Sequence, residues 1–144
     1  MKNELRVILV IFLLAAITIN AASKPEINPD TIKLKQGYSL HLADVNIDKT
    51  LIAPEWYRNA TLQLIYHGNV IDTKLVEIGS PPLPYTGNFE LYDGTTLIVS
   101  GEDIRIFFGQ TVELIMIHNL TQYNGNKILY QESSINLYHY DTVT

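Results

Sequence analysis

The sequence predicts an all-β fold, an antiparallel β-sandwich of Greek-key type with roughly eight or nine short strands. Residues Ala60–Gly79 predict a β-hairpin, because two alternating runs flank a short turn at His67-Gly68-Asn69. Asp93-Gly94 separates two further β-rich runs and predicts a type I′ hairpin turn. The chain also contains 9 tyrosines and no amphipathic helical pattern of useful length. These features favour strands over helices.

The N-terminal residues 1–23 are predicted to be a secretory signal peptide. Lys2 and Arg6 precede an apolar run from Val7 to Ile19, and small residues suited to signal peptidase follow. The apolar core of about 13 residues is shorter than the ~20 that a membrane-spanning helix needs. The alternative is an uncleaved anchor, and only in that case is the membrane a partner. Residues 24–30 are interpreted as a polar linker, and residues 31–144 as one domain.

Composition restricts the partners and the chemistry of this domain. The net charge of −5 argues against binding to nucleic acid or to anionic lipid. The absence of cysteine excludes disulfides, thiolate metal sites and cysteine nucleophiles. The predicted secretion signal places the protein outside the cell or at the cell surface. Core packing, calcium, glycans or assembly must then provide the stability that disulfides give many small secreted domains.

The first strands of the domain follow the predicted linker. Thr31–Leu42 predicts one strand bent at Gly37, or two short strands, and Asp44–Asp48 predicts another. The apolar alternation changes parity between these runs, which indicates a β-bulge at Ala43-Asp44. Lys49–Asn59 is predicted to be a loop that contains the only tryptophan, Trp56.

The second half of the chain predicts more short strands after the Ala60–Gly79 hairpin. Ser80–Pro84 is excluded from a sheet, because proline lacks the amide hydrogen of a ladder bond. Val112–His118 is a near-continuous apolar run and predicts a strand that is central or buried on both faces. The remaining predicted elements are strands at Phe89–Tyr92, Thr95–Val99 and Ile104–Phe108, a turn at Asn124-Gly125, and a closing strand at Lys127–Tyr140.

Several short motifs occur in a fixed order over nearly the whole domain. They are Gly37-Tyr38 with Leu40; Asp44-Val45 with Asp48; Leu62, Leu64 and Gly68; Ile71-Asp72, Leu75-Val76 and Gly79; Tyr85; Phe107-Phe108-Gly109; and Gln122-Tyr123. This order resembles the duplication domain of archaeal, methanogen-type S-layer proteins. The chain corresponds to the later half of that module, in a single copy. It lacks the lysine that usually precedes the hairpin glycine, and its Trp56 loop is an insertion.

The resemblance implies a secreted structural protein of an archaeal cell-surface coat, which acts by assembly and has no enzymatic activity. Its expected partners are itself or a main S-layer protein. The alternative is an extracellular binding module that recognises a surface glycan or a protein. In that reading Trp56 provides the ligand face together with exposed tyrosines. The six tyrosines considered are Tyr85, Tyr92, Tyr123, Tyr130, Tyr138 and Tyr140. The simpler interpretation is that these aromatic residues pack in the core or pair across neighbouring strands.

A candidate calcium site, and the only cofactor considered, lies at Asp44, Asn46 and Asp48. Oxygen ligands at alternating positions suit Ca²⁺, and Glu55 falls where the twelfth residue of an EF-hand loop would lie. Lys49 occupies the position at which such a loop needs glycine, so the alternative is a solvated strand face. If calcium binds, millimolar calcium should raise the melting temperature of the protein, and an unchanged melting temperature would contradict the site.

Two N-glycosylation sequons are present, at Asn59-Ala60-Thr61 and Asn119-Leu120-Thr121. Asn59 is expected at the end of a loop and is the more favourable acceptor, whereas Asn119 is expected near the end of a buried strand. No catalytic residue is predicted. The four histidines show no metal-ligand spacing, and no nucleophile-elbow pattern is present.

Overall fold

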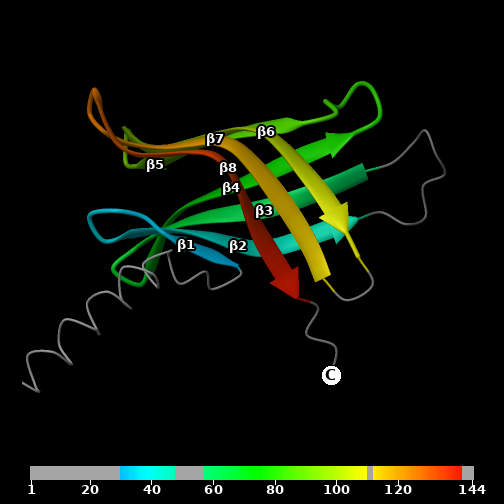
Figure 1. Ribbon diagram of the computed structural model, residues 1–144, viewed down its shortest axis with the longest axis horizontal. Helices are drawn as coiled ribbons and strands as arrows, with labels where there is room; N and C mark the ends of the chain where they lie inside the picture. Colours follow the sequence, from blue (N-terminus) through cyan, green and yellow to red (C-terminus); the bar gives the residue numbers. More distant parts are fainter. Residues whose placement is uncertain (1–29, 48–56, 110–111, 141–144) are drawn as a thin grey trace, which may run out of the picture.

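The computed structural model describes residues 30–47, 57–109 and 112–140, and these residues form two four-stranded antiparallel sheets (Figure 1). The first sheet has the order β1-β2-β3-β4 and the second has the order β5-β6-β7-β8. The strands are β1 (Thr31–Lys33), β2 (Tyr38–Ile47), β3 (Tyr57–Tyr66), β4 (Asn69–Gly79), β5 (Gly87–Asp93), β6 (Thr96–Phe108), β7 (Val112–Asn124) and β8 (Lys127–Tyr140). The predicted all-β class is therefore confirmed. The predicted signal peptide, most of the linker and residues 49–56 of the predicted Trp56 loop lie outside the described residues.

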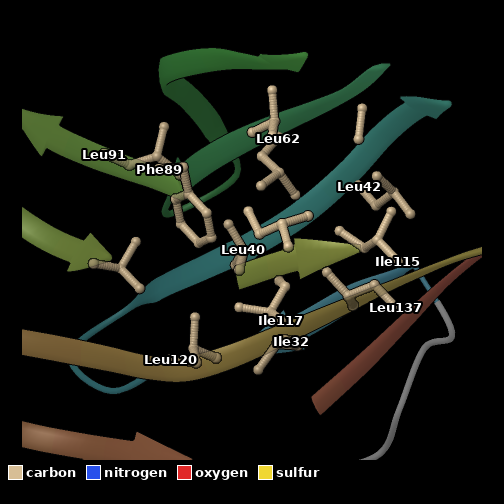
Figure 2. Packing of buried hydrophobic residues seen from close by; sticks show 14 of the residues in the cluster. Ile32, Leu40, Leu42, Leu62, Phe89, Leu91, Ile115, Ile117, Leu120 and Leu137 are labelled. Carbon is tan, nitrogen blue, oxygen red and sulfur yellow. The ribbon is translucent and has the colours of Figure 1, made fainter. Parts of the chain in front are cut away.

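One hydrophobic core receives side chains from both sheets. Leu40, Leu42 and Leu62 of the first sheet and Ile115 and Ile117 of the second are all fully buried. Figure 2 shows these side chains pointing into the same space between the strands. Burial of this apolar surface is the main favourable term for folding in a chain without disulfides.

The first sheet follows the sequence pattern closely. Gly37 has φ +84° and lies in the turn between β1 and β2, so the chain forms two strands here, as one alternative states. The second strand is longer than predicted, because β2 continues into the run predicted as a separate strand at Asp44–Asp48. The β2–β3 register shifts between Leu42 and Asp44, which confirms the predicted bulge. His67 and Gly68 both have positive φ and join β3 to β4, as a type I′ turn requires. The Ala60–Gly79 hairpin is thus confirmed, although β3 begins earlier, at Tyr57.

The second sheet differs from the prediction in its turns and strand lengths. Asp93 pairs with Thr96, so the loop residues are Gly94-Thr95 rather than Asp93-Gly94. Of the two, only Gly94 has positive φ, which is typical of a type II′ turn and not of type I′. The two runs predicted at Thr95–Val99 and Ile104–Phe108 form the single strand β6.

The strand β7 is central in its sheet, between β6 and β8, as one of the two predicted alternatives states. Burial on both faces is wrong. Ile115 and Ile117 are buried, whereas the alternating residues Leu114 and Met116 are only half-buried. One face of β7 packs on the core, and the other face carries apolar side chains on the outer surface of the sheet.

The predicted Greek-key connectivity is also wrong. Within each sheet every strand pairs with its neighbour in the sequence, so each sheet is a meander. The chain changes sheets between β4 and β5, through the segment that begins at Ser80 and contains the cis Pro81-Pro82 bond. The prolines therefore lie outside the ladders, as predicted.

Polar side chains connect the two sheets at several points. Gln122 of β7 hydrogen-bonds the backbone of Lys35 with both ends of its amide, at 2.8 Å each. Arg58 of β3 donates to the carbonyl of Ile106 in β6 at 2.6 Å. Asp72 of β4 accepts the amide of Tyr92 in β5 at 2.7 Å. These bonds fix the relative position of the sheets beyond what non-directional apolar packing achieves.

Candidate functional site

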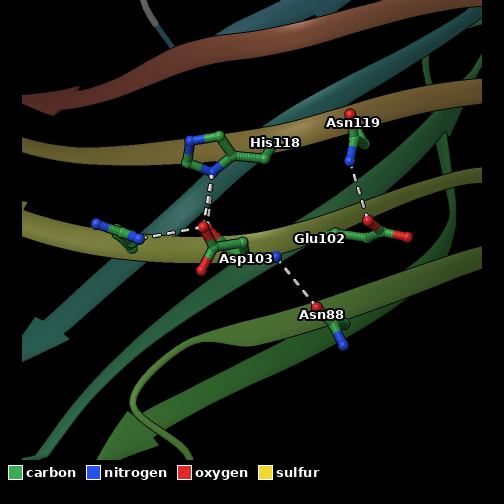
Figure 3. A network of polar contacts seen from close by, with 6 residues as sticks. Asn88, Glu102, Asp103, His118 and Asn119 are labelled. Atoms are coloured by element: carbon green, nitrogen blue, oxygen red, sulfur yellow. Dashed lines mark hydrogen bonds and ion pairs between the residues drawn. The ribbon is translucent and has the colours of Figure 1, made fainter.

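The outer surface of the second sheet carries a polar cluster where β6 and β7 are irregular. The cluster consists of Asn88, Glu102, Asp103, Arg105, His118 and Asn119 (Figure 3). The β6–β7 register shifts on both sides of Glu102. Asp103 has φ +47° and Asn119 has φ +49°, a conformation that aspartate and asparagine tolerate better than most residues. Paired β-bulges of this kind turn side chains away from the regular alternation.

Asp103 is the centre of the cluster. Its Oδ2 atom lies 3.3 Å from Nη2 of Arg105 and 3.4 Å from Nδ1 of His118, and the same His118 nitrogen lies 3.0 Å from the Asp103 carbonyl oxygen. The Asp103 amide donates to Oδ1 of Asn88 at 3.1 Å. The strained backbone of this bulge is therefore held on three sides by side chains from β5, β6 and β7.

The charged groups of the cluster are paired with neighbouring side chains of the cluster. Its acidic groups are engaged, Asp103 with Arg105 and His118 and Glu102 with the Asn119 amide. Within the described residues, no three His, Asp or Glu side chains converge to hold a metal ion. Asn119 is exposed at the bulge, and its amide makes one hydrogen bond, to the exposed Glu102.

The two sequons lie in contrasting environments. Asn59 is only 9% exposed and lies within β3, so its predicted position at the end of a loop is wrong. Its Nδ2 atom donates to the hydroxyl of Tyr57 at 2.9 Å. Asn119 is exposed, although it lies in the interior of β7, and Thr121 Oγ1 donates to its carbonyl at 3.1 Å. The bulge explains why a residue in a central strand is accessible.

We expect any glycan on the folded protein to be attached to Asn119 rather than to Asn59. The amide of Asn119 can be released by breaking one exposed hydrogen bond, whereas Asn59 must leave the sheet. The check is the intact mass of native protein and of the Asn119→Gln and Asn59→Gln variants. Loss of the added mass only in Asn59→Gln would contradict this expectation, and an unmodified native mass would reject both sequons.

The structure describes two of the three predicted calcium ligands. Asp44 and Asn46 are exposed on the same side of β2, whereas Asp48 and Glu55 lie outside the described residues. Asp44 Oδ2 accepts the Asn46 amide at 2.8 Å, and Oδ1 accepts the amide of Val45 at 3.0 Å. This arrangement already satisfies Asp44 without a cation. The calcium site stays a prediction.

The six predicted aromatic ligand residues do not form one platform. Tyr123 lies at the β7–β8 turn, whereas Tyr138 and Tyr140 lie at the opposite end of the same strand pair. Tyr138 instead belongs to a row that the sequence analysis missed. It is the register partner of Leu114, which pairs in turn with Phe107. We call Phe107, Leu114 and Tyr138 the outer apolar row.

A small polar cavity lies at the turn end of the molecule. It has a volume of about 200 Å³ and is lined by Gln36, Tyr38, Asp93, Thr96, Ile98, Tyr123 and Asn124. Tyr38 donates to Oδ2 of Asp93 at 2.8 Å and packs its ring 4.6 Å from that of Tyr66. Aromatic walls beside a carboxylate and amides are suited to a small polar ligand.

The raised pKa values of two tyrosines predict that the protein loses stability in alkaline solution. Burial, together with the hydrogen bond to Asp93, raises the pKa of Tyr38 to about 12 from its ordinary value of 10.0. Burial and the hydrogen bond to Glu132 raise the pKa of Tyr130 to about 12 as well. The unfolded chain thus releases these protons near pH 10, before the folded chain does. The stabilisation is complete below pH 10 and is lost as the pH rises through about 12.

The measurement is the free energy of unfolding as a function of pH for the native chain and the Tyr38→Phe/Tyr130→Phe variant. Phenylalanine does not titrate, so the variant should lose stability less steeply above pH 10. Equal slopes for the two proteins would contradict the assigned tyrosines.

The described part of the chain defines its class as an all-β protein of two packed antiparallel sheets, with a polar cluster and an outer apolar row on the second sheet. No family model matches the chain, and neither a curated protein nor a solved structure is found to be similar to it. The resemblance to S-layer domains therefore stays a prediction. Among the residues that the structure describes, no helix occurs that could cross a membrane.

Proposed function

We propose that this protein is a secreted structural component of an archaeal-type cell-surface coat and that it acts by assembly with itself or with a main S-layer protein. The order of motifs from Gly37 to Tyr123 supports the family. The fold supports the mode of action, because two meander sheets that pack face to face form a β-sandwich with open strand edges. An acidic surface suits a porous, charged coat.

The observation that carries the proposal is the strand β8. It is 14 residues long and lies at the edge of the second sheet, where it pairs with β7 on one side. Strands in globular proteins usually have three to ten residues, and exposed edges are usually kept short or charged. A long edge strand is therefore a surface that suits contact with another protein chain.

The experiment is fractionation of the source cells. We expect the protein in the envelope fraction, and we expect it to remain there after treatment with mild detergent. We also expect protease added to intact cells to cleave it. Recovery mainly in the cytoplasm, or complete release by detergent together with membrane lipids, would contradict a coat component.

The alternative is an extracellular binding module, and the cavity beside Tyr38 and Asp93 favours it. A pocket of about 200 Å³ is of a size to accept a single sugar ring. Trp56, the residue first assigned to this role, lies outside the described residues. Titration of the protein with monosaccharides, followed by tyrosine and tryptophan fluorescence, separates the two functions. Saturable binding that is lost in Asp93→Ala would favour the binding module.

A further inference from the structure

The edge strands of the two sheets are unequal in length and charge. The strand β1 has only three residues. The strand β4 carries Asp72, Lys74 and Glu77, and it is tied to β5 of the other sheet through Asp72. The strand β8 differs from these, because the stretch Ser133–Tyr140 contains no Asp, Glu, Lys or Arg. The fourth edge strand, β5, has seven residues, two of them acidic. Charges on an edge discourage pairing with another chain, so the uncharged stretch of β8 is the least protected part of the described edges.

The side chains of this uncharged stretch alternate in a regular way. Leu137 is buried and Ile135 packs against the core, while Asn136 and Tyr138 lie on the outer face with their register partners Met116 and Leu114. The backbone of every second residue of an edge strand directs its N–H and C=O groups away from the sheet. Ser133–Tyr140 therefore offers an ordered row of donors and acceptors next to apolar side chains.

Asn136 lies in the middle of this stretch and is not satisfied within the single chain. Its Oδ1 atom is the one buried side-chain oxygen or nitrogen, among the described residues, that has no hydrogen-bond partner. Leaving such an acceptor unpaired is unfavourable. The terminal torsion of an asparagine has a broad energy profile, so its amide can turn toward a neighbouring strand. A second amide at this position would supply the missing donor.

We propose that β8 pairs antiparallel with β8 of a second copy of this chain, about a twofold axis at Asn136. This proposal rests on the proposed assembly function and specifies the surface through which two copies make contact. A continuous sheet requires opposed residues to share a face, and with period-two alternation this places one residue opposite its own copy. With Asn136 at the axis, the two amides meet, Ile135 faces Leu137 on the core side, and Ser134 faces Tyr138 on the outer side.

The net charge of the chain favours a second copy as the partner that pairs with β8. A protein of net charge −5 repels its own copies, so self-association needs a contact without acidic groups. Ser133–Tyr140 meets this condition, and Glu132 lies just beyond it. An asparagine amide has both a donor and an acceptor and is therefore complementary to itself across a twofold axis. Twofold dimers are also the commonest symmetric assemblies.

Cysteine cross-linking tests this register, because the chain has no cysteine of its own. The full sequence is expressed in a secreting host with Asn136→Cys, and the purified protein is oxidised mildly. Directly opposed residues of paired strands have Cβ atoms about 4.5–5.5 Å apart, close enough for a disulfide after a small adjustment. We expect a disulfide-linked dimer as the main product on a non-reducing gel.

Two controls are matched to this variant. Ser134→Cys lies on the same strand and face, but the two copies of residue 134 would be about 14 Å apart, four residues at about 3.4 Å per residue. Thr73→Cys is an exposed residue of the β4 edge. Neither variant should give a disulfide-linked dimer on the non-reducing gel. A mixture of Ser134→Cys and Tyr138→Cys chains should cross-link, and it tests the same register if Asn136→Cys does not fold.

The outcomes separate this contact from the coat function. Absence of a dimer in Asn136→Cys and in the mixture, or equal cross-linking of all the variants, would overturn the β8 pairing. If the envelope fractionation still succeeds, the coat function stands and another surface makes the contact. A specific Asn136→Cys dimer in a protein that is absent from the envelope would retain the pairing and reject the coat.

Discussion

Replacing Gln122 with leucine is expected to lower the free energy of unfolding by about 2–4 kcal/mol, because two partly buried backbone groups lose their partners. Gln122 is fully buried. Its Oε1 atom accepts the Lys35 amide and its Nε2 atom donates to the Lys35 carbonyl, each at 2.8 Å. Lys35 lies in the turn between β1 and β2, so this one side chain connects the second sheet to the first. Leucine fills a similar volume but offers no polar atom.

The measurement is urea denaturation at equilibrium, with Gln131→Leu as the matched control. Gln131 is exposed on β8 and is the register partner of Thr121, the residue before Gln122. Surface substitutions of this kind usually change stability by no more than about 0.5 kcal/mol. If both leucine variants unfold at the same urea concentration as the native protein, the inter-sheet role of Gln122 is wrong.

The second large effect is expected at Gly101, where alanine should cost about 1–3 kcal/mol through overpacking. Gly101 is buried at the first shift of the β6–β7 register. A Cβ atom at this position would overlap Cε1 of Phe89 and would lie 2.6 Å from Cγ2 of Ile117. Neither neighbour can move freely, because Phe89 and Ile117 are themselves buried core residues.

Two comparisons isolate this steric cause. Gly109→Ala introduces the same methyl group where the nearest atom, the carbonyl oxygen of Val112, lies 3.4 Å away, and it should be nearly neutral. Phe89→Leu should destabilise the native chain but restore part of the stability of Gly101→Ala, because it removes the overlapping ring. Strictly additive effects in this double-mutant cycle would contradict a direct contact.

Local sequence patterns predicted much of the fold. The alternating runs around His67-Gly68 predicted the β3–β4 hairpin, and the parity change after Leu42 predicted the bulge. Both features depend on residues that are neighbours in the sequence. The prolines of Ser80–Pro84 similarly marked where the chain leaves the first sheet. In each case the side-chain pattern and the backbone chemistry favour the same structure.

The errors concern features that depend on distant contacts. The order of strands within a sheet is decided by packing between residues far apart, so the sequence did not exclude a Greek key. The polar segment around Asn59 predicts a loop, but β3 extends into it. There the side-chain amide of Asn59 donates a hydrogen bond to the hydroxyl of Tyr57. The burial of Gln122 has no local sequence signal, because its hydrogen-bond partner, Lys35, lies 87 residues away.

The candidate site was predicted only in part. The sequon at Asn119 was recognised, but its exposure results from paired bulges that no local pattern indicates. Asp103 and His118 converge only after β6 and β7 pair. Asn119 interrupts the apolar alternation of Ile115 and Ile117, and both Asp103 and Asn119 are residue types that accept positive φ. Neither observation shows that the two residues lie in paired strands.

The central claim is that this protein acts by assembly, and sedimentation velocity over a series of concentrations tests it most directly. The protein is measured alone and mixed with envelope sheets from the source cells. We predict a sedimentation coefficient that rises with concentration, as β8 edges pair, and co-sedimentation with the sheets. A single monomeric species at every concentration, which stays in solution when the sheets sediment, would contradict the account.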